Sequence, residues 1–191
     1  YLVKNRLIYS FQSSFRPSYS TDTALTHMAD QIRFNMGNGL YTGILLLDLQ
    51  KAFDTVNHNI LLEKLKSIGA DEITCAWFSS YLNDRKQFVG LNGIRPTLQS
   101  VSCGVPQGSI MGPLLFSIYV NDMKTAVSCH LYLYADDSAL ICSGKNAQEI
   151  ELTLGQELKN VKKWIEVNQL SIHLGKTESI LFSTKNMLKR Q

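Results

Sequence analysis

Two adjacent acidic residues interrupt an apolar stretch of the chain. Asp136 and Asp137 lie within LYLYADDSALICSG, residues 131–144, whose flanks are typical of buried β-strands. Neighbouring carboxylates repel each other, and burial adds to the cost of ionising them. A third acid, Asp48, closes the apolar run YTGILLLDL, and such an unalternating run is typical of a strand buried on both faces. These three acids are the first candidates for chemistry.

Each acid also has an ordinary interpretation, because a single Asp after a strand is usually a turn or cap residue. Three acids at one end of one sheet are harder to explain in this way, since their repulsion requires a counter-charge. A divalent cation supplies one, and carboxylate oxygens suit Mg²⁺. Two such ions, about 3.5 to 4 Å apart, can promote phosphoryl transfer. The residues alone therefore favour Mg²⁺-dependent phosphoryl transfer and name no substrate.

The composition is that of an ordinary globular domain. The chain has 191 residues, 45% of them hydrophobic and 18% charged, which fits one domain with a substantial core. Its formal charge of +3 is compatible with a polyanionic partner but does not indicate one. No apolar run is long enough for a membrane span. The four cysteines are Cys75, Cys103, Cys129 and Cys142, and their spacing is not that of a zinc site. Their scattered positions make a disulfide framework unlikely and favour an intracellular setting.

The hydrophobic periodicity places helices between the apolar strands. Five helices are expected: one from after Ser20 to 37–39, one from Ile60 to Ile68, one from about 71 to 81, one that begins near Pro113, and one from Asn146 to near Leu170. Strands are expected at YTGILLLDL, in a hairpin around Asn92-Gly93, in the acidic hairpin, and in SIHLGKTESILFS. From the first strand onward the order is β-α-α-β-β-α-β-β-α-β. It predicts an α+β domain with an antiparallel sheet and helices packed on one face.

Several sequence blocks resemble the reverse transcriptases of non-LTR retrotransposons and, more distantly, those of group II introns and retroviruses. LLLDLQKAFDTVNHNIL, GVPQGSIMGPLLF, YADD and NQLSIHLGKTESILF are similar to the first four palm motifs, in the family's order. FQSSFRPSYSTDTAL is similar to a fingers-side block upstream. A single Y-x-D-D has little specificity, whereas five ordered blocks that cover almost the whole chain have much more. The resemblance implies an incomplete right-hand polymerase fold, with 1–40 as a fingers-side remnant and 41–191 as the palm.

The resemblance also implies a two-metal site for nucleotidyl transfer. Asp48 and Asp136 match the two main metal ligands, Asp137 the accessory acid, and the Leu49 carbonyl an assisting ligand. The implied cofactor is a pair of Mg²⁺ ions, with Mn²⁺ as a substitute. Lys176 matches a lysine that protonates the departing pyrophosphate, although a solvated lysine at the end of a strand is an equal alternative.

Four further residues match positions that bind the incoming nucleotide. Phe53 matches a steric gate that excludes a ribose 2′-hydroxyl, where a core aromatic is the alternative. Gln107 and Gly108 match a loop that contacts the nucleotide sugar, where a plain Pro-Gln-Gly turn is the alternative. Arg16 matches a fingers-side arginine, where a surface ion pair is the alternative.

Other residues receive no role from the sequence. Asp54 and His58 recur in the family but could simply cap the following helix. Arg85 and Lys86 could contact a nucleic-acid backbone, although two charges in a loop are usually just solvated.

The resemblance implies RNA template, DNA primer and dNTP as partners, together with the thumb and endonuclease of a larger polyprotein. It also implies that the protein acts in the nucleus if the element is live. The proposed reaction is RNA-directed DNA synthesis. An alternative from another class is a catalytically silent palm remnant that at most binds nucleic acid or a protein partner. Because a duplex grip relies on many phosphate contacts, a charge of +3 predicts weak or no processive synthesis by this chain alone.

Overall fold

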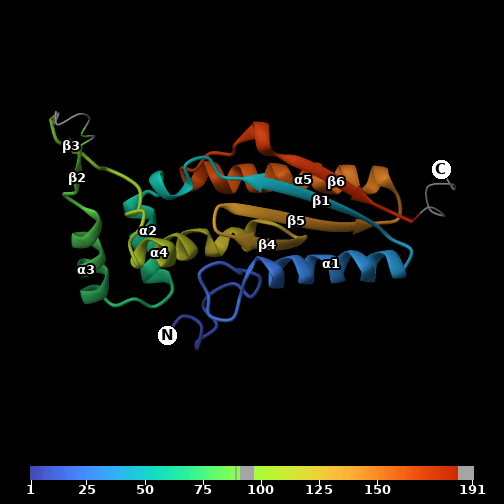
Figure 1. Cartoon of the computed structure of the whole chain (residues 1–191), viewed down its shortest axis with the longest axis horizontal. Coiled ribbons are helices and arrows are strands. Elements are labelled where there is room, and N and C mark those ends of the chain that lie inside the picture. Colours follow the sequence, from blue (N-terminus) through green and yellow to red (C-terminus); the bar gives the residue numbers. More distant parts are fainter. Residues whose placement is uncertain (89, 91–96, 185–191) are drawn as a thin grey trace.

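The computed structural model describes residues 1–88, 90 and 97–184 (Figure 1). In chain order, the helices and strands are α1 (Thr21–Gly37), β1 (Tyr41–Asp48), α2 (His58–Ser67), α3 (Glu72–Leu82), β2 (Lys86–Gln87), β3 (Gln99–Ser100), α4 (Met111–Val120), β4 (His130–Tyr134), β5 (Asp137–Gly144), α5 (Ala147–Val167) and β6 (Glu178–Phe182). Short 3₁₀ helices cover Ala52–Asp54, Asn121–Ala126 and Leu174–Lys176. The predicted α+β domain and the positions of its main elements are confirmed.

The central sheet is antiparallel, with the strand order β4-β5-β1-β6. β1 lies between β5 and β6, which explains why its apolar residues do not alternate with polar ones. The expected strand–turn–strand at the C-terminal end is a 3₁₀ helix followed by one strand, β6. β4 and β5 form the predicted acidic hairpin, which is joined by Ala135 and Asp136.

Helices cover both faces of this sheet, so the prediction of helices on one face is wrong. α5 packs on the face that carries Leu45 and Leu47, whereas α1 contacts β1 and β4 on the face that carries Ile44 and Leu46. Figure 1 shows the sheet between these two helices. The physical reason is in β1 itself, because a strand that is apolar on both faces requires cover on both.

The helix starts follow the expected capping chemistry. Ser20 caps α1 and forms a reciprocal capping box with Thr23. Asn146 caps α5 by accepting from the Glu149 N–H at 2.8 Å. The sequence Asn146 with Glu149 resembles a capping box, but the Glu149 carboxylate accepts from Lys145 N–H instead of the N-cap N–H, so this box is only half formed.

A second group of elements lies at one end of the sheet. α2 packs on both α3 and α4, and the short pair β2–β3 follows α3 (Figure 1). The predicted hairpin is present in this pair, but its Asn92-Gly93 turn lies outside the described residues. The loop between β3 and α4 returns from this group to the carboxyl end of β1.

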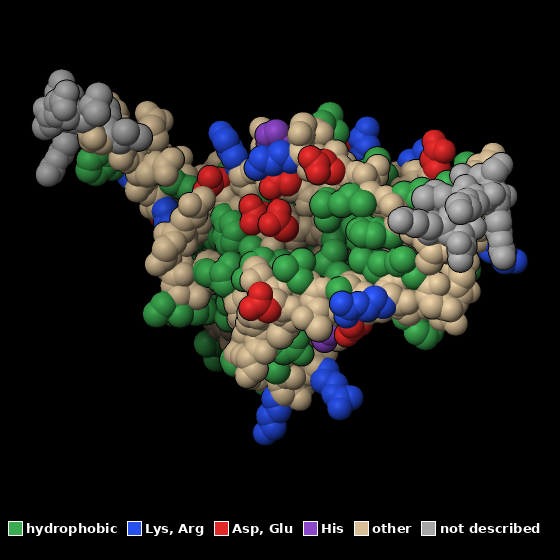
Figure 2. Space-filling model, turned by 45° about the vertical axis from the view of Figure 1, so that its right-hand side comes forward, with side chains coloured by type: hydrophobic (Ala, Val, Ile, Leu, Met, Phe, Trp, Pro, Cys, Tyr) green, Lys and Arg blue, Asp and Glu red, His purple; other side chains and the backbone are tan. Residues whose placement is uncertain are grey.

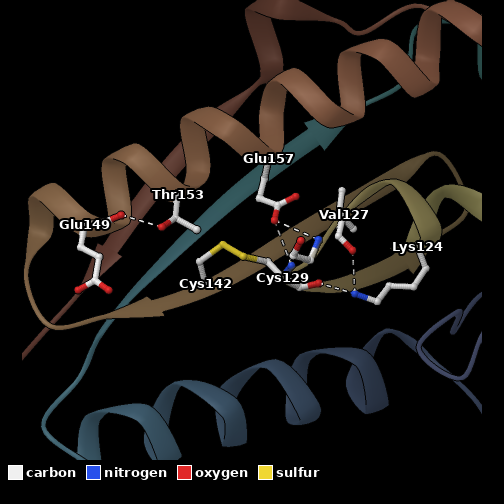
Figure 3. The surroundings of a disulfide bond; sticks show 8 residues. Lys124, Val127, Cys129, Cys142, Glu149, Thr153 and Glu157 are labelled. Atoms are coloured by element: carbon white, nitrogen blue, oxygen red, sulfur yellow. Dashed lines mark hydrogen bonds between the residues drawn. A yellow bond between two sulfur atoms is a disulfide. The ribbon is translucent and has the colours of Figure 1, made fainter.

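A disulfide joins Cys129 to Cys142, although the sequence made a disulfide framework unlikely (Figure 3). The pairing follows from the register of the β4–β5 hairpin: His130 lies opposite Ile141, so the preceding residue lies opposite Cys142, at a Cα–Cα distance of 5.4 Å. The sequence could not show this because the register depends on where the hairpin turns. Glu157 of α5 anchors the same end of the hairpin by accepting from Cys129 N–H at 3.3 Å.

The helices of the described residues include none that combines the length and the apolarity needed to cross a membrane.

Candidate active site

The sheet brings the three candidate acids to one edge. Asp48 is the last residue of β1 and lies directly opposite Asp137, the first residue of β5. Asp136 lies in the turn just before β5, and its carbonyl accepts from Leu49 N–H at 3.4 Å. Antiparallel pairing of β1 with the hairpin therefore brings together acids that are almost ninety residues apart in the sequence.

The acids share one nearby positive charge. Lys176 Nζ lies 3.2 Å from Asp48 Oδ2, and the Asp48 side chain is only 17% exposed. Burial raises the pKa of Asp137, and the carboxylates of Asp136 and Asp48 raise it further, whereas Lys176 lowers it. The centre consequently holds more negative charge than its own lysine neutralises.

Backbone strain occurs on both sides of this centre. Ala135, in the hairpin turn, has φ +54°, and Lys51, three residues after Asp48, has φ +48°. A side chain in the left-handed region costs about 1 to 2 kcal/mol, and such residues cluster at functional sites. Neither could be predicted from the sequence, because glycine is absent from both positions.

The donor set fits a hard divalent cation, although the side chains do not surround a common point. Within residues 1–88, 90 and 97–184, no three acidic, histidine or cysteine side chains form a ready-made ligand cluster. Their carboxylate oxygens are nevertheless the ligands that Mg²⁺ prefers, and the pKa of Asp137 is raised by burial first and then by the carboxylates of Asp136 and Asp48. A cation at this position would compete with Lys176 for Asp48.

A groove of 570 Å³ opens beside the acids. It lies between α1 and the sheet, and its lining includes Asp48, Asp137 and Lys176 together with apolar side chains such as Met28 and Leu46. Figure 2 shows acidic and basic side chains gathered next to a hollow lined by hydrophobic ones. The acids are thus accessible from the surface.

Phe53 and Gln107 lie close together although they come from different segments. Phe53 is half-buried, and its ring stacks on Phe116 with the centroids 4.4 Å apart. Its carbonyl accepts from Val105 N–H at 2.8 Å, which brings the loop before α4 against the segment after β1. Gln107 is exposed on that loop.

The remaining predicted residues are placed as follows. Gly108 follows Gln107 with φ +77° and open space where a Cβ would lie. Arg16 is folded inward: its Nη1 donates to the carbonyls of Tyr9, Ser10 and Gln12, and its guanidinium lies 4.1 Å from the Tyr19 ring. Arg16 organises its own loop, an arrangement that was not among the sequence-based expectations.

The structure assigns contacts to three residues that the sequence left without a role. Asp54 Oδ1 accepts from Gln107 Nε2 at 2.8 Å. His58 Nε2 and Arg85 Nη2 both bond to the carbonyl of Gly104, at 2.9 and 2.6 Å. The first two contacts join segments 53 and 46 residues apart, and the third joins residues 19 apart, so no local sequence signal could have indicated them.

Comparison with known proteins agrees with this geometry. Residues 2–188 match the family model described as reverse transcriptase (RNA-dependent DNA polymerase). The chain belongs to the reverse transcriptase family. Among curated relatives, this reverse transcriptase domain is 28% identical over 96% of its length to the RNA-directed DNA polymerase from mobile element jockey of Drosophila melanogaster, and 31% identical over 93% to that of Drosophila funebris. It spans about a fifth of each relative, 22% and 20%.

Solved structures support the same fold. Apo telomerase from Candida tropicalis, truncated from its C-terminal domain, superposes with a TM-score of 0.66 at 17% identity, over 90% of this chain and 36% of the telomerase. Telomerase from Candida albicans, in complex with a fragment of telomeric RNA, superposes with a TM-score of 0.62 at 14% identity, over 96% of this chain and 33% of the telomerase. At these identities the likeness establishes the right-hand polymerase fold of the reverse transcriptase domain and nothing finer. The resemblance of the sequence to retrotransposon reverse transcriptases is confirmed.

Proposed function

We propose that this domain catalyses RNA-directed DNA synthesis at the centre formed by Asp48, Asp136 and Asp137. The observation that carries the proposal is the pairing of Asp48 with Asp137 across β1 and β5, with Asp136 in the adjoining turn. Such a concentration of acids beside an open groove is costly to folding, and cation-assisted phosphoryl transfer gives it a use.

The proposed reaction transfers a nucleotide from dNTP to a primer. The primer 3′-hydroxyl gives up its proton to solvent, its oxygen forms a bond to the α-phosphorus, the bond from that phosphorus to the bridging oxygen breaks, and pyrophosphate leaves. Mg²⁺, or Mn²⁺ in its place, would acidify the 3′-hydroxyl and neutralise charge on the phosphates when bound. The protein ligands would be the carboxylates of Asp48, Asp136 and Asp137 and the carbonyl of Leu49.

Other residues of the chain would bind and orient the nucleotide. Phe53 rests on the buried Phe116, so a rigid aromatic edge is available to exclude a ribose 2′-hydroxyl. Gln107 and Gly108 would contact the sugar, since Gly108 leaves its backbone open to close approach. The inward contacts of Arg16 support a role in holding the fingers-side loop.

Lys176 is the proposed acid for the leaving group. Its ammonium lies within 3.2 Å of Asp48, so it is close to the transfer site, and an ammonium can donate a proton to departing pyrophosphate. We further assign 1–40 to a fingers-side portion and 41–191 to the palm. The template RNA, the DNA primer and the rest of a polyprotein would be its partners.

The test is primer extension on an RNA template, with dNTPs and Mg²⁺, by this chain and by a form extended on both sides. We expect incorporation by the extended form and slower, distributive incorporation by this chain, whose net charge is only +3. A folded extended form that incorporates no nucleotide would overturn the proposal.

A further inference from the structure

The loop before α4 is fixed to the segment after β1 by backbone contacts. Gly104 N–H donates to Val56 C=O at 2.8 Å, and Val105 N–H donates to Phe53 C=O at the same distance. Gly104 has φ +83°, and a Cβ built on it would lie 2.6 Å from the Asp54 carbonyl oxygen. Only glycine allows this approach, so the two segments meet backbone to backbone.

The carbonyl of Gly104 is held from the other side. It accepts from His58 Nε2 at 2.9 Å and from Arg85 Nη2 at 2.6 Å. Because a carbonyl oxygen only accepts, His58 must carry its proton on Nε2. With the loop backbone held by these bonds, the freedom that remains near Gln107 is mainly that of its own side chain.

Asp54 removes that remaining freedom. Its Oδ1 accepts from Gln107 Nε2 at 2.8 Å, although both residues are exposed. An ionised carboxylate has no hydrogen to donate, so it selects the amide nitrogen of Gln107 and turns the amide oxygen away. That oxygen is then available as an acceptor for a hydroxyl group.

We propose that Asp54 is a positioning residue that sets the orientation of the Gln107 amide and thereby the affinity for the deoxynucleotide sugar. The inference rests on the proposed nucleotide contact of Gln107. The nucleotide 3′-hydroxyl is a donor of the required kind, and it is present on every dNTP. Phe53, the residue before Asp54, would limit the other side of the same sugar.

The test is a double-mutant cycle in the primer-extension assay, with Asp54→Asn and Gln107→Ala. Asn keeps the size of Asp but can donate as well as accept, so it no longer selects the amide nitrogen of Gln107. We expect Asp54→Asn to raise KM for dNTP about tenfold, as for loss of a hydrogen bond to a charged group, with kcat changed less than about twofold. In the Gln107→Ala background, Asp54→Asn should have no further effect, because Asp54 acts through that side chain.

Controls separate this role from a loss of folding. Asp54→Ala removes the acceptor without adding a donor and should change KM in the same direction. Asp30→Asn changes an exposed acid on α1, which is paired with Arg33, and should leave KM unchanged. Thermal midpoints of all variants are measured in parallel.

Each outcome is decisive. An unchanged KM in both Asp54→Asn and Asp54→Ala, or effects of Asp54→Asn and Gln107→Ala that multiply in the double variant, would overturn this inference and leave the proposed function standing. Absence of incorporation by the wild type in its extended form would overturn the proposed function, and this inference with it.

Discussion

Replacing Gly104 by Ala tests the close approach of the loop to the segment after β1. The new Cβ would lie 2.6 to 2.9 Å from the backbone O, Cα and C atoms of Asp54. Backbone atoms cannot rotate away as a side chain does, so one of the two segments must move. Gly108→Ala is the matched control, because Gly108 has a similar φ of +77° but nothing within 4 Å of a Cβ.

The expected magnitude has two parts. A left-handed φ costs an alanine about 1 to 2 kcal/mol, and this part is common to both variants. Overpacking adds about 1 to 3 kcal/mol at Gly104 alone. We therefore expect Gly108→Ala to lower the free energy of unfolding by about 1 to 2 kcal/mol and Gly104→Ala by about 2 to 5 kcal/mol.

Urea unfolding followed by circular dichroism measures both values, provided that the m-values of the variants agree. In a chain of 191 residues, the difference between the variants should also appear as a lower thermal midpoint of Gly104→Ala, by roughly 2 to 4 °C per kcal/mol. Equal destabilisation by the two substitutions would refute the packing of Gly104 on Asp54.

Three further predictions concern the sheet and its acids. Gly43→Ala should destabilise the fold by about 1 to 3 kcal/mol in urea unfolding, because its Cβ would overlap Ile150 of α5. Reducing the Cys129–Cys142 bond with dithiothreitol should lower the free energy of unfolding by up to about 3 kcal/mol, as for a closed loop of this length. Dithiothreitol should have no such effect on the control variant Cys129→Ser. Asp137→Asn should stabilise the fold at pH 7 by at most about 1 kcal/mol after solvent screening. Because the pKa of Asp137 is raised in the folded state, this gain in stability should shrink as the pH falls through that pKa towards about 4. A gain in stability that is independent of pH would contradict the charge argument.

Local sequence patterns predicted the elements well because each pattern has a local physical cause. The apolar run before Asp48 indicated a central strand, and the Ser20 and Asn146 caps marked helix starts that the structure confirms. The family resemblance placed the three acids together, and strand pairing gives the reason: Asp48 and Asp137 are opposite residues in the β1–β5 register.

Features that depend on long-range register or on side-chain direction could not be predicted in this way. The helix on the second face of the sheet, the Cys129–Cys142 bond and the inward turn of Arg16 all depend on which segments meet in space. The bond between Asp54 and Gln107 is of the same kind, because it joins residues that are adjacent only after the loop has docked.

The rate of single-nucleotide incorporation by Asp136→Asn shows whether the three acids form the catalytic centre. The substitution keeps the size of the side chain and removes one charge from the proposed cation site. On a primed RNA template, in the extended form, we expect Asp136→Asn to lower this rate by about a thousandfold or more and the control Asp30→Asn to leave it unchanged. Incorporation by Asp136→Asn at the wild-type rate would contradict the assignment of this acid cluster as the catalytic centre.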